Sequence, residues 1–436
     1  MQAQLETLSA LERRLSIAVP REEIAKQVDA RLKRVAKTAK IDGFRPGKAP
    51  LNVVFQSHGF RIQEEVLGET VERSFGEAVV EQKLQVAGYP RFEAKQDAAE
   101  NGPFEFVATF EVYPEIKLGD LSAVEVQKPT LVVGDAEVNK TIDILRSQRT
   151  RFERVERAAA AGDRVIIDFK GTIDGVAFAG GSSDNYAFVI GNGQMLPEFE
   201  AGVVGMKEDE TKDVTVAFPA EYHGKDVAGK TAVFAITVKN VAAANLPALD
   251  ADFAKSLGIV DGDVEKMRAE VKGNLEREVR FRLKSRVKEN AMSAVIEATP
   301  IELPRSLISL EIGRLVEGAQ ADLQQRGIDP KTVPFQPALF EAQARRRVHL
   351  GLVLSELVEA EKLSTQPEQI KAIIEDLAQN YEDPSEVVAW YYESPDRLSG
   401  PTNMALEDNV VEFVLSKAKV TEQAIAFDEL MGQQGQ

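Results

Sequence analysis

Cysteine is absent from the 436-residue chain, which also contains only three histidines and one tryptophan. Without a thiol, the chain forms no disulfide and offers no cysteine nucleophile or cysteine-based zinc site. The histidines, His58, His223 and His349, lie far apart in the sequence, and none belongs to a ligand-like pair such as HxxxH. We therefore predict neither a metal site nor a cofactor.

Long apolar runs are missing as well. No stretch reaches the roughly 18 apolar residues that a membrane-spanning helix needs. Glu6 and Glu12 interrupt the N-terminal segment where a signal peptide would require its apolar centre. We expect a cytoplasmic protein that does not contact a membrane.

The charge of the chain is strongly negative overall but positive in one segment. With 70 acidic and 53 basic residues the formal charge is −17, which argues against nonspecific nucleic-acid binding by the whole surface. Residues 31–48 have the opposite charge. They contain a single acid, Asp42, and seven bases: Arg31, Lys33, Arg34, Lys37, Lys40, Arg45 and Lys48. Such runs are commonly solvated helix faces. Here the run has a single sign and ends at the turn GFRPGKAP, which favours a docking surface.

The first part of the chain has the pattern of an α+β domain that closes near residue 115. After Pro20, one apolar stripe at steps of three or four predicts a helix, formed by Ile24, Val28, Leu32, Val35 and Ala39. More helical sequence follows GFRPGKAP, and FEFVATFEVYP is typical of a strand. A connector of residues 116–160 contains one predicted strand, AVEVQKPTLVV, and one predicted helix, DAEVNKTIDILRSQRTRFERV.

Residues 163–241 alternate strictly, as half-buried strands do. Val214, Val216 and Phe218 share one face, and Phe234, Ile236 and Val238 share another. Glycine-bearing turns separate these strands, and PEFEAG is typical of a short helix because proline suits a first helical turn. We predict a compact antiparallel β domain.

After Pro247 the pattern is almost entirely helical to the end of the chain. Apolar residues at every fourth position predict one long helix, and they are Met267, Val271, Leu275, Val279, Leu283 and Val287. We expect about five more helices, bounded by Pro304, Pro330, Pro334, Pro367, Pro384 and Pro401. Their many charges favour long, solvent-exposed arms.

Four motifs of the β domain occur in an order that resembles the FKBP-type peptidyl-prolyl isomerases. They are DRVIIDFKGTIDGVAFAGG, FVIGNGQMLPEFEAGVVGMKEDE, VAFPAEYHG and GKTAVFAITVKNV. Aromatic residues of a small domain usually form its core, but several here lie beside glycines, where a residue more often lines a cavity. The resemblance implies a proline-binding pocket lined by Phe169, Phe178, Tyr186, Met195, Leu196, Phe199, Tyr222 and Phe234. The family usually has an acid after the residue matched by Phe178, whereas this chain has Ala179.

The order of the domains, with the basic N-terminal domain first, the β domain in the centre and the helical region last, is similar to that of the trigger factors, a family of ribosome-associated bacterial chaperones. The resemblance implies a multidomain α+β fold: an N-terminal α+β ribosome-binding domain (1–115), the connector (116–160), a central FKBP-type antiparallel β domain with a short helix (161–245), and a long α-helical C-terminal region that holds substrates (246–436). It also implies that the ribosome is contacted by Gly43, Phe44, Arg45, Pro46, Gly47 and Lys48. Members of the family often have lysine in place of Pro46.

The partners implied by this resemblance are a ribosomal protein, ribosomal RNA beside the exit tunnel, and nascent or unfolded polypeptides. A weak homodimer is compatible with it. Two other functions fit the same residues. One is a stand-alone prolyl isomerase whose flanking domains only localise it, and the other is a ribosome assembly factor without general chaperone activity.

Overall fold

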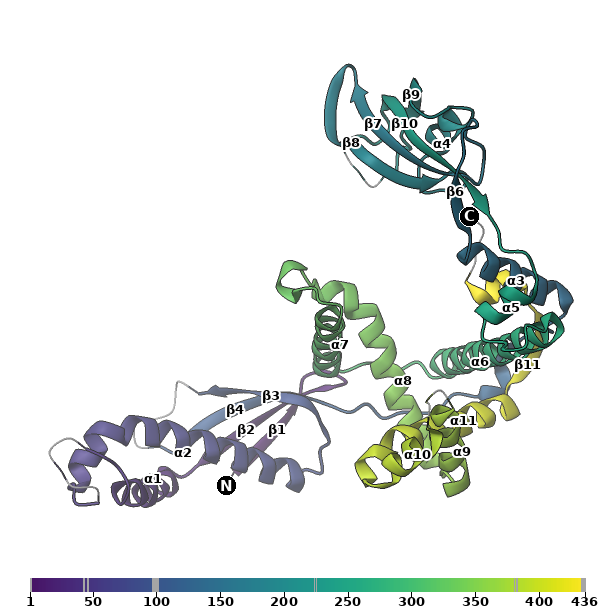
Figure 1. The fold of residues 1–436 in the computed structure, drawn as a ribbon. Helices are drawn as coiled ribbons and strands as arrows, with labels where there is room; N and C mark the ends of the chain where they lie inside the picture. Colours follow the sequence, from purple (N-terminus) through teal and green to yellow (C-terminus); the bar gives the residue numbers. More distant parts are fainter. Residues whose placement is uncertain are drawn as a thin grey trace. The chain divides into compact units, whose positions relative to one another are not determined.

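The computed structural model describes residues 2–41, 44, 47–95, 102–222, 224, 226–379, 381 and 383–432. The chain forms two units, one of residues 1–126 and 288–420 and the other of residues 127–287 and 421–436 (Figure 1). Both units contain helices, and the sheets are antiparallel wherever the pairing is described, so the multidomain α+β prediction is confirmed. None of the described helices is at once long enough and apolar enough to cross a membrane.

An antiparallel sheet of order β1-β2-β4-β3 begins the first unit. Its strands are β1 (Gln2–Thr7), β2 (Glu12–Val19), β3 (Val86–Ala94) and β4 (Phe104–Val112). Leu15, Ile17 and Val19 alternate along β2 and are buried on the same face. The predicted strand β4 is confirmed, whereas the β1–β2 hairpin and β3 are not among the elements that we predict from the sequence.

Helices α1 (Arg21–Ala36) and α2 (Leu51–Glu81) lie against each other and confirm the predicted helical segments. Val28 and Leu32 of α1 pack against the first half of α2. The second half of α2 places Phe75 and Ala78 on the buried face of the sheet. The basic end of α1 is therefore fixed in place by an apolar interface.

The C-terminal helices of the first unit are α7 (Arg305–Gln325), α8 (Glu341–Ala360), α9 (Pro367–Ala378), α10 (Pro384–Tyr392) and α11 (Pro395–Lys417). Short 3₁₀ helices span Leu121–Ala123, Pro330–Thr332 and Pro337–Phe340. Val126 and the end of the long helix α6 (Val264–Ala298) share a core with α8 and α11, through Val353, Leu357, Val410 and Val414.

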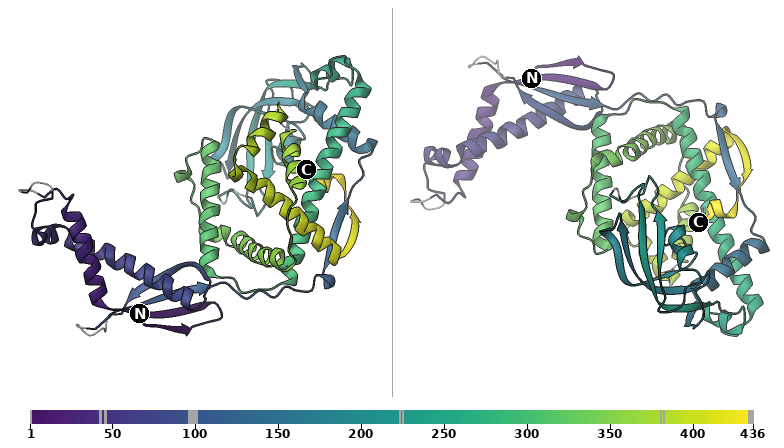
Figure 2. Two further views of the ribbon diagram at one scale, coloured as in Figure 1. Left: turned by 90° about the horizontal axis from the view of Figure 1, so that it is seen from below. Right: turned by 90° about the horizontal axis from the view of Figure 1, so that it is seen from above.

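The C-terminal region is largely helical, as predicted, but one predicted helix boundary is wrong. Pro401 does not bound a helix but lies buried inside α11. A proline removes one backbone hydrogen bond, and the turns on either side of it can stay helical. One strand, which we do not predict, interrupts the helices: β11 (Lys419–Ala424) pairs with the predicted connector strand β5 (Glu125–Thr130), seen as a yellow strand beside a blue one in Figure 2.

The single tryptophan of the chain lies on α10. Trp390 is half exposed, and the guanidinium of Arg397 lies over its ring, 4.3 Å from the ring centre. Arg397 also donates a hydrogen bond of 2.7 Å to the backbone carbonyl of Trp390. A cation over the face of an indole ring is electrostatically favourable, so this contact orients the tryptophan.

The second unit has a helical core and a β domain. The helical core combines α3 (Asp135–Gln148), α5 (Ala251–Ser256), the first part of α6 and α12 (Phe427–Met431). Met267, Leu275 and Val279 are buried there, which confirms the predicted stripe of α6. The predicted connector helix ends earlier than expected, because Arg151–Arg154 form strand β6, paired with β10.

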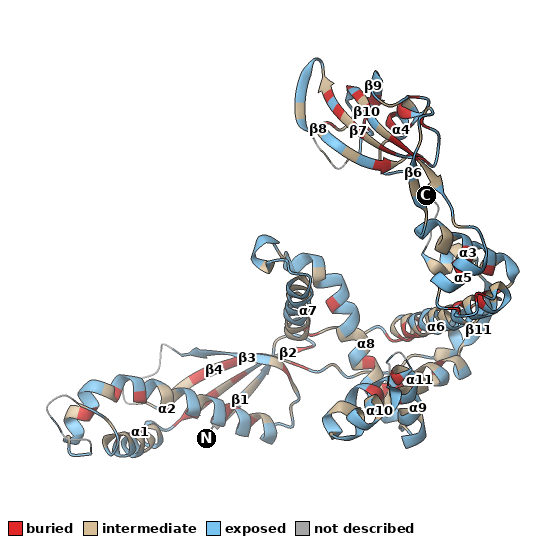
Figure 3. Ribbon diagram, in the orientation of Figure 1, coloured by how far each residue is buried: buried red, intermediate tan, exposed pale blue. Residues whose placement is uncertain are grey.

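The β domain contains β7 (Arg164–Ile173), β8 (Val176–Val189), β9 (Thr211–Ala217) and β10 (Thr231–Asn245), with the strand order β6-β10-β7-β8 and β9 also paired with β10. The alternation on β9 and β10 is confirmed, since every apolar residue predicted to share a face is buried. Buried segments are visible along β7 and β10 in Figure 3. PEFEAG forms the predicted helix α4 (Pro197–Val203).

Within the first unit, a carboxylate of the N-terminal sheet caps α7. The oxygens of Glu111 on β4 accept hydrogen bonds from the backbone N–H groups of Arg305 (3.0 Å) and Ser306 (2.6 Å). Ser306 Oγ in turn donates to the carbonyl of Ala87 at 2.8 Å. A negative charge at the first turn satisfies free N–H groups and complements the helix dipole.

We expect Glu111→Gln to speed amide exchange in the first turns of α7, because an amide group offers one acceptor oxygen to two N–H donors. The loss of a helix cap costs about 1 kcal/mol. Hydrogen exchange of the full chain, followed by mass spectrometry, measures this effect. Glu105→Gln is the matched control, since Glu105 lies on the same strand and pairs with Lys95 at the surface. Equal exchange in both variants would contradict the capping role.

Candidate functional site

The β domain gathers its aromatic side chains into one cluster. Phe169 on β7 makes edge-to-face contacts with Tyr186 and Phe199, with ring centres 5.9 and 5.5 Å apart. Phe234 on β10 contacts Phe199 at 5.3 Å and Phe178 at 6.0 Å. Edge-to-face geometry is the favoured arrangement of aromatic pairs. The structure thus brings together side chains from β7, β8, α4 and β10.

All of the residues predicted to line the proline-binding pocket belong to this cluster, but their exposure differs. Phe169, Phe199 and Phe234 are buried, whereas the others are only partly buried and lie at its edge: Phe178, Tyr186, Met195, Leu196 and Tyr222. The role of these residues in proline binding stays a prediction. Phe199 is 2% exposed, so its replacement by alanine would cost about 3–5 kcal/mol of stability. Variants at the edge are therefore the better test.

Two glycines allow the rings to lie close to the strands. A Cβ atom on Gly181 would lie 2.8 Å from the ring of Phe178, and one on Gly171 would lie 2.5 Å from the ring of Phe234. Both distances are far below a normal carbon–carbon contact. Each ring therefore rests on a strand position that only glycine leaves open.

Asp168 fixes the backbone beside Tyr186. Its carboxylate accepts a 2.7 Å hydrogen bond from the N–H of Asn185 and lies 3.3 Å from Lys239 Nζ. These contacts, the backbone hydrogen bond first, hold the pKa of Asp168 below its usual range. Asn185 has a φ of +55°, a left-handed conformation that asparagine tolerates better than most residues. Ala179, in the place where the FKBP-type family usually has an acid, is exposed.

An ion pair between the buried Asp163 and the exposed Arg157 anchors the chain where it enters the β domain. Asp163 is 3% exposed and accepts two hydrogen bonds from the guanidinium of Arg157 (2.6 and 2.8 Å) and one from the N–H of Ala160 (2.9 Å). Burial alone would raise the pKa of Asp163, but these hydrogen bonds and the charge of Arg157 outweigh it and hold the pKa below its usual range.

Only part of the predicted ribosome-binding turn can be described. Phe44 is 40% exposed, and its N–H donates to the carbonyl of Ile41 at 3.1 Å. Gly47 has a φ of +79°, and Lys48 is exposed. Gly43, Arg45 and Pro46 lie outside the described residues.

The cations before this turn differ in their contacts. Arg31 pairs with Glu69 of α2 at 3.0 Å. Lys33, Arg34, Lys37 and Lys40 are exposed, and no ion pair joins them to another residue in the described part of the chain. Their charges therefore face solvent and are free to meet an anionic partner.

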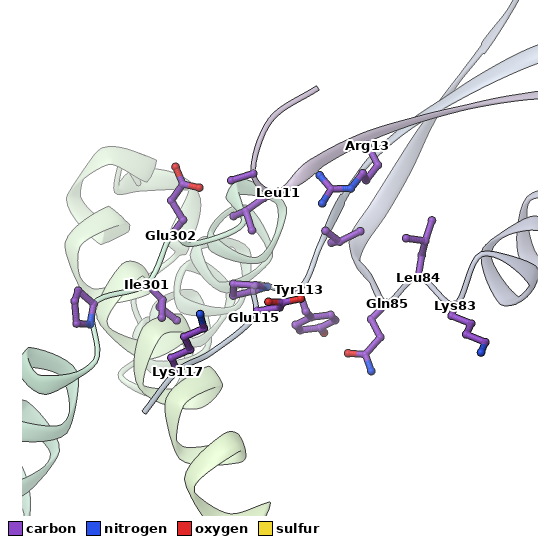
Figure 4. A pocket seen from close by; sticks show the side chains of 14 residues that line it. Leu11, Arg13, Lys83, Leu84, Gln85, Tyr113, Glu115, Lys117, Ile301 and Glu302 are labelled. Carbon is purple, nitrogen blue, oxygen red and sulfur yellow. The ribbon is translucent and has the colours of Figure 1, made fainter. Parts of the chain in front are cut away.

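An open cavity of about 810 Å³ lies in the first unit, where the segments after β4 and after α6 run beside the N-terminal sheet (Figure 4). Its charged side chains come from several segments and include Arg13, Lys83, Lys117, Glu115 and Glu302. None of the site residues predicted from the sequence lines it. Its charges are of both signs and therefore do not select one class of ligand.

Metal binding has no support in the described part of the chain, where no group of three or more histidine, aspartate or glutamate side chains could hold an ion. His223 lies outside the described residues.

Comparison with known proteins matches nearly the whole chain. Residues 1–145 match the family model described as bacterial trigger factor protein, residues 263–416 match the model of its C-terminus, and residues 155–239 match that of the FKBP-type peptidyl-prolyl cis-trans isomerases. The trigger factor of Chromobacterium violaceum is 64% identical, with 100% of both chains covered. That of Laribacter hongkongensis is also 64% identical over 99% of this chain and 100% of its own, and that of Neisseria meningitidis is 54% identical over the full length of both.

We expect Asp163→Asn to accelerate amide exchange in β7 about tenfold at pH 7. The amide nitrogen of the new asparagine would be a buried donor that faces the donors Arg157 and Ala160, and an unsatisfied buried donor costs about 1–3 kcal/mol. Because the pKa of Asp163 is lower in the folded chain than in the unfolded chain, where it is about 4, the ionised carboxylate stabilises the fold at pH values above about 4. This stabilisation is lost as the pH falls through the pKa of Asp163 in the folded chain. The difference between wild type and variant should therefore shrink in acid. Asp213→Asn, at an exposed position of β9, is the control. A pH-independent difference would rule out the ionised pair as its source.

Proposed function

The chain belongs to the trigger factor family, chaperones with an FKBP-type peptidyl-prolyl isomerase domain, and from this premise we propose how its parts divide the work. Residues 1–115 bind the ribosome, residues 116–160 connect, residues 161–245 isomerise X-Pro bonds, and residues 246–436 hold unfolded polypeptide. The observation that carries this proposal is the full-length match to trigger factors together with the aromatic cluster of the β domain.

The aromatic cluster suits prolyl isomerisation for a physical reason. Rotation about an X-Pro bond has a barrier of about 20 kcal/mol, because it breaks amide resonance, and it takes tens of seconds without a catalyst. A twisted amide is less dipolar than a planar one. An apolar site that excludes water therefore disfavours the planar ground state relative to the transition state. The partly exposed edge of the cluster, with Phe178, Tyr186, Met195, Leu196 and Tyr222, is where we place the proline.

We expect Phe178→Leu to lower kcat/KM for a prolyl tetrapeptide roughly tenfold, about 1.4 kcal/mol of transition-state stabilisation, because a flat ring is lost from the edge of the site. Exchange NMR of the peptide measures kcat and KM. Val176→Ala is the matched control, since Val176 lies two residues earlier on β8 and is 70% exposed. Unchanged kcat/KM in Phe178→Leu would remove the cluster from the reaction.

The same variant separates a chaperone from a stand-alone isomerase. Phe178→Leu should still suppress aggregation of a client whose folding is not limited by proline, since holding is assigned to other residues. Loss of both activities together would favour the stand-alone isomerase. An assembly factor would instead retain few co-purifying polypeptides, whereas a chaperone retains many.

Ribosome docking is assigned to the turn Gly43–Lys48 and the exposed cations before it. Phe44 provides an exposed apolar anchor, and Arg45 can engage a carboxylate or a phosphate with two hydrogen bonds. Lys33, Arg34, Lys37 and Lys40 add positive charge beside the turn. The proposed contacts are a ribosomal protein and the ribosomal RNA near the exit tunnel.

We expect simultaneous alanine substitution of Phe44, Arg45 and Lys48 to abolish co-sedimentation with ribosomes nearly completely and to leave prolyl isomerisation unchanged. Because RNA contacts release counterions, wild-type binding should weaken steeply as salt rises. The matched control replaces Tyr89, Arg91 and Lys83, an exposed triple of similar composition at the other end of α2 and on β3. Wild-type affinity in the first triple variant would show that GFRPGKAP is only a turn.

The helical region is assigned the holding of unfolded chains because apolar side chains remain exposed on and beside its helices. Examples are Leu339, Tyr381, Trp390, Tyr392 and Met404, of which Leu339 is 74% exposed. These exposed apolar groups are available to contact an unfolded chain. The proposal also includes a weak homodimer, which sedimentation velocity at rising concentration would detect.

A further inference from the structure

Glu200 is a buried acid in the β domain, close to the aromatic cluster. It lies on α4 next to Phe199, is 7% exposed, and forms no ion pair with another described residue. Burial of an ionisable group without a cation is costly unless its oxygens accept hydrogen bonds. The contacts of this carboxylate therefore show what it stabilises.

Both oxygens of Glu200 bind the loop that follows β8. Oε2 accepts a 2.7 Å hydrogen bond from the N–H of Gly191, and Oε1 accepts a 3.1 Å hydrogen bond from the N–H of Met195. The two donors lie at opposite ends of a short loop. This loop leads directly into Met195 and Leu196, which pack at the edge of the aromatic cluster.

The rest of the loop has little rigidity of its own. Gly191 and Gly193 both have positive φ values, +94° and +66°. Two hydrogen bonds join the loop to Val189 at the end of β8: the N–H of Asn192 donates to the Val189 carbonyl at 3.3 Å, and Gln194 Oε1 accepts from the Val189 N–H at 3.1 Å. Glycine has more conformations to lose than any other residue, so such a segment is ordered only by bonds from outside. Asp163 fixes the beginning, because its carbonyl accepts from the N–H of Ile190 at 3.0 Å. Glu200 binds the N–H groups of the first and last residues of the segment 191–195.

We propose that Glu200 is a positioning residue for prolyl isomerisation, which holds the loop 191–195 so that Met195 and Leu196 form one wall of the site. The inference rests on the proposed location of the site at the aromatic cluster. A carboxylate suits this task because it presents two acceptor oxygens, whereas a glutamine would present one acceptor and one donor. Phe199 and Glu200 are adjacent on α4, so the same helix supplies a ring to the cluster and a clamp to its wall.

The expected kinetic signature follows from the way an unclamped loop behaves. If only a fraction of molecules has the loop in the binding-competent position, the apparent affinity falls by that fraction. Bound substrate selects the competent loop, so the turnover at saturation stays the same. Glu200→Gln should therefore raise KM for a prolyl tetrapeptide about tenfold and leave kcat within about twofold.

The test compares Glu200→Gln with Glu198→Gln in the full chain, using exchange NMR for the kinetics and amide exchange for the backbone. Glu198 lies on the same helix but is exposed, so its variant should behave as wild type. In Glu200→Gln, amide exchange should accelerate in 191–195 and stay unchanged in β7 and β10. Glu200→Asp keeps the charge but is too short to reach both donors, and it should show the same KM increase.

Three outcomes would overturn the proposal: unchanged KM in Glu200→Gln, a fall in kcat at constant KM, or faster exchange throughout β7 and β10, which would mark Glu200 as a general support of the fold. Phe178→Leu, measured in parallel, separates this inference from the proposed site. If Phe178→Leu loses activity and Glu200→Gln does not, only the positioning role fails. If neither variant loses activity, the proposed site fails.

Discussion

The apolar core of the first unit is built from segments that the sequence places far apart, and the rest of the structure depends on this. Val126 packs with the end of α6 and with residues of α8 and α11, so residues 127–287 form one long insertion that leaves this core and returns to it. Closing so long a loop costs little more than closing a shorter one, since each doubling adds only about 0.6 kcal/mol. The insertion can therefore carry a complete domain, but both of its ends have to be fixed.

The connection to the N-terminal sheet is fixed by close backbone contact. A Cβ on Gly119 would lie only 1.8 Å from the carbonyl oxygen of Ala298, so glycine alone fits. The N–H of Gly119 donates to Thr299 Oγ1 at 3.1 Å, and His349 Nε2 lies 2.7 Å from the Thr299 carbonyl. Three segments thus meet around one buried threonine, and Glu111 adds a polar contact between the sheet and α7. The N-terminal domain is joined to the helices by specific hydrogen bonds as well as by the covalent chain.

Periodicity predicted the elements that bury one regular face. The stripe of α6 and the alternation of β9 and β10 repeat over several turns or residues, and the structure buries the predicted sides. The features that the sequence did not predict correctly have a different origin. Strand β11 has no buried residue, and β6 is short and charged, so both owe their conformation to a partner strand that local sequence does not reveal. A local rule predicts a helix boundary at Pro401, but Pro401 lies buried inside α11.

At the candidate site, too, the sequence predicts some features and misses others. The rings of the cluster were identifiable from the family motifs, because each is a characteristic residue at a characteristic spacing. Phe199, however, is a core residue, and Glu200 holds a loop, and the sequence alone shows neither fact. PEFEAG has two acids beside Phe199, and the sequence does not show that Glu200 is buried while Glu198 is exposed. Only the positions of Gly191 and Met195 show which partners Glu200 has.

The contact between Trp390 and Arg397 has a consequence for how the molecule can be observed. Because the chain has a single tryptophan, on α10, its indole emission arises entirely from that helix and is modulated by the adjacent guanidinium. The β domain contributes only phenylalanine and tyrosine to the ultraviolet signal. An unfolding curve followed by tryptophan emission therefore traces the helical part of the first unit, and the β domain can melt without being seen.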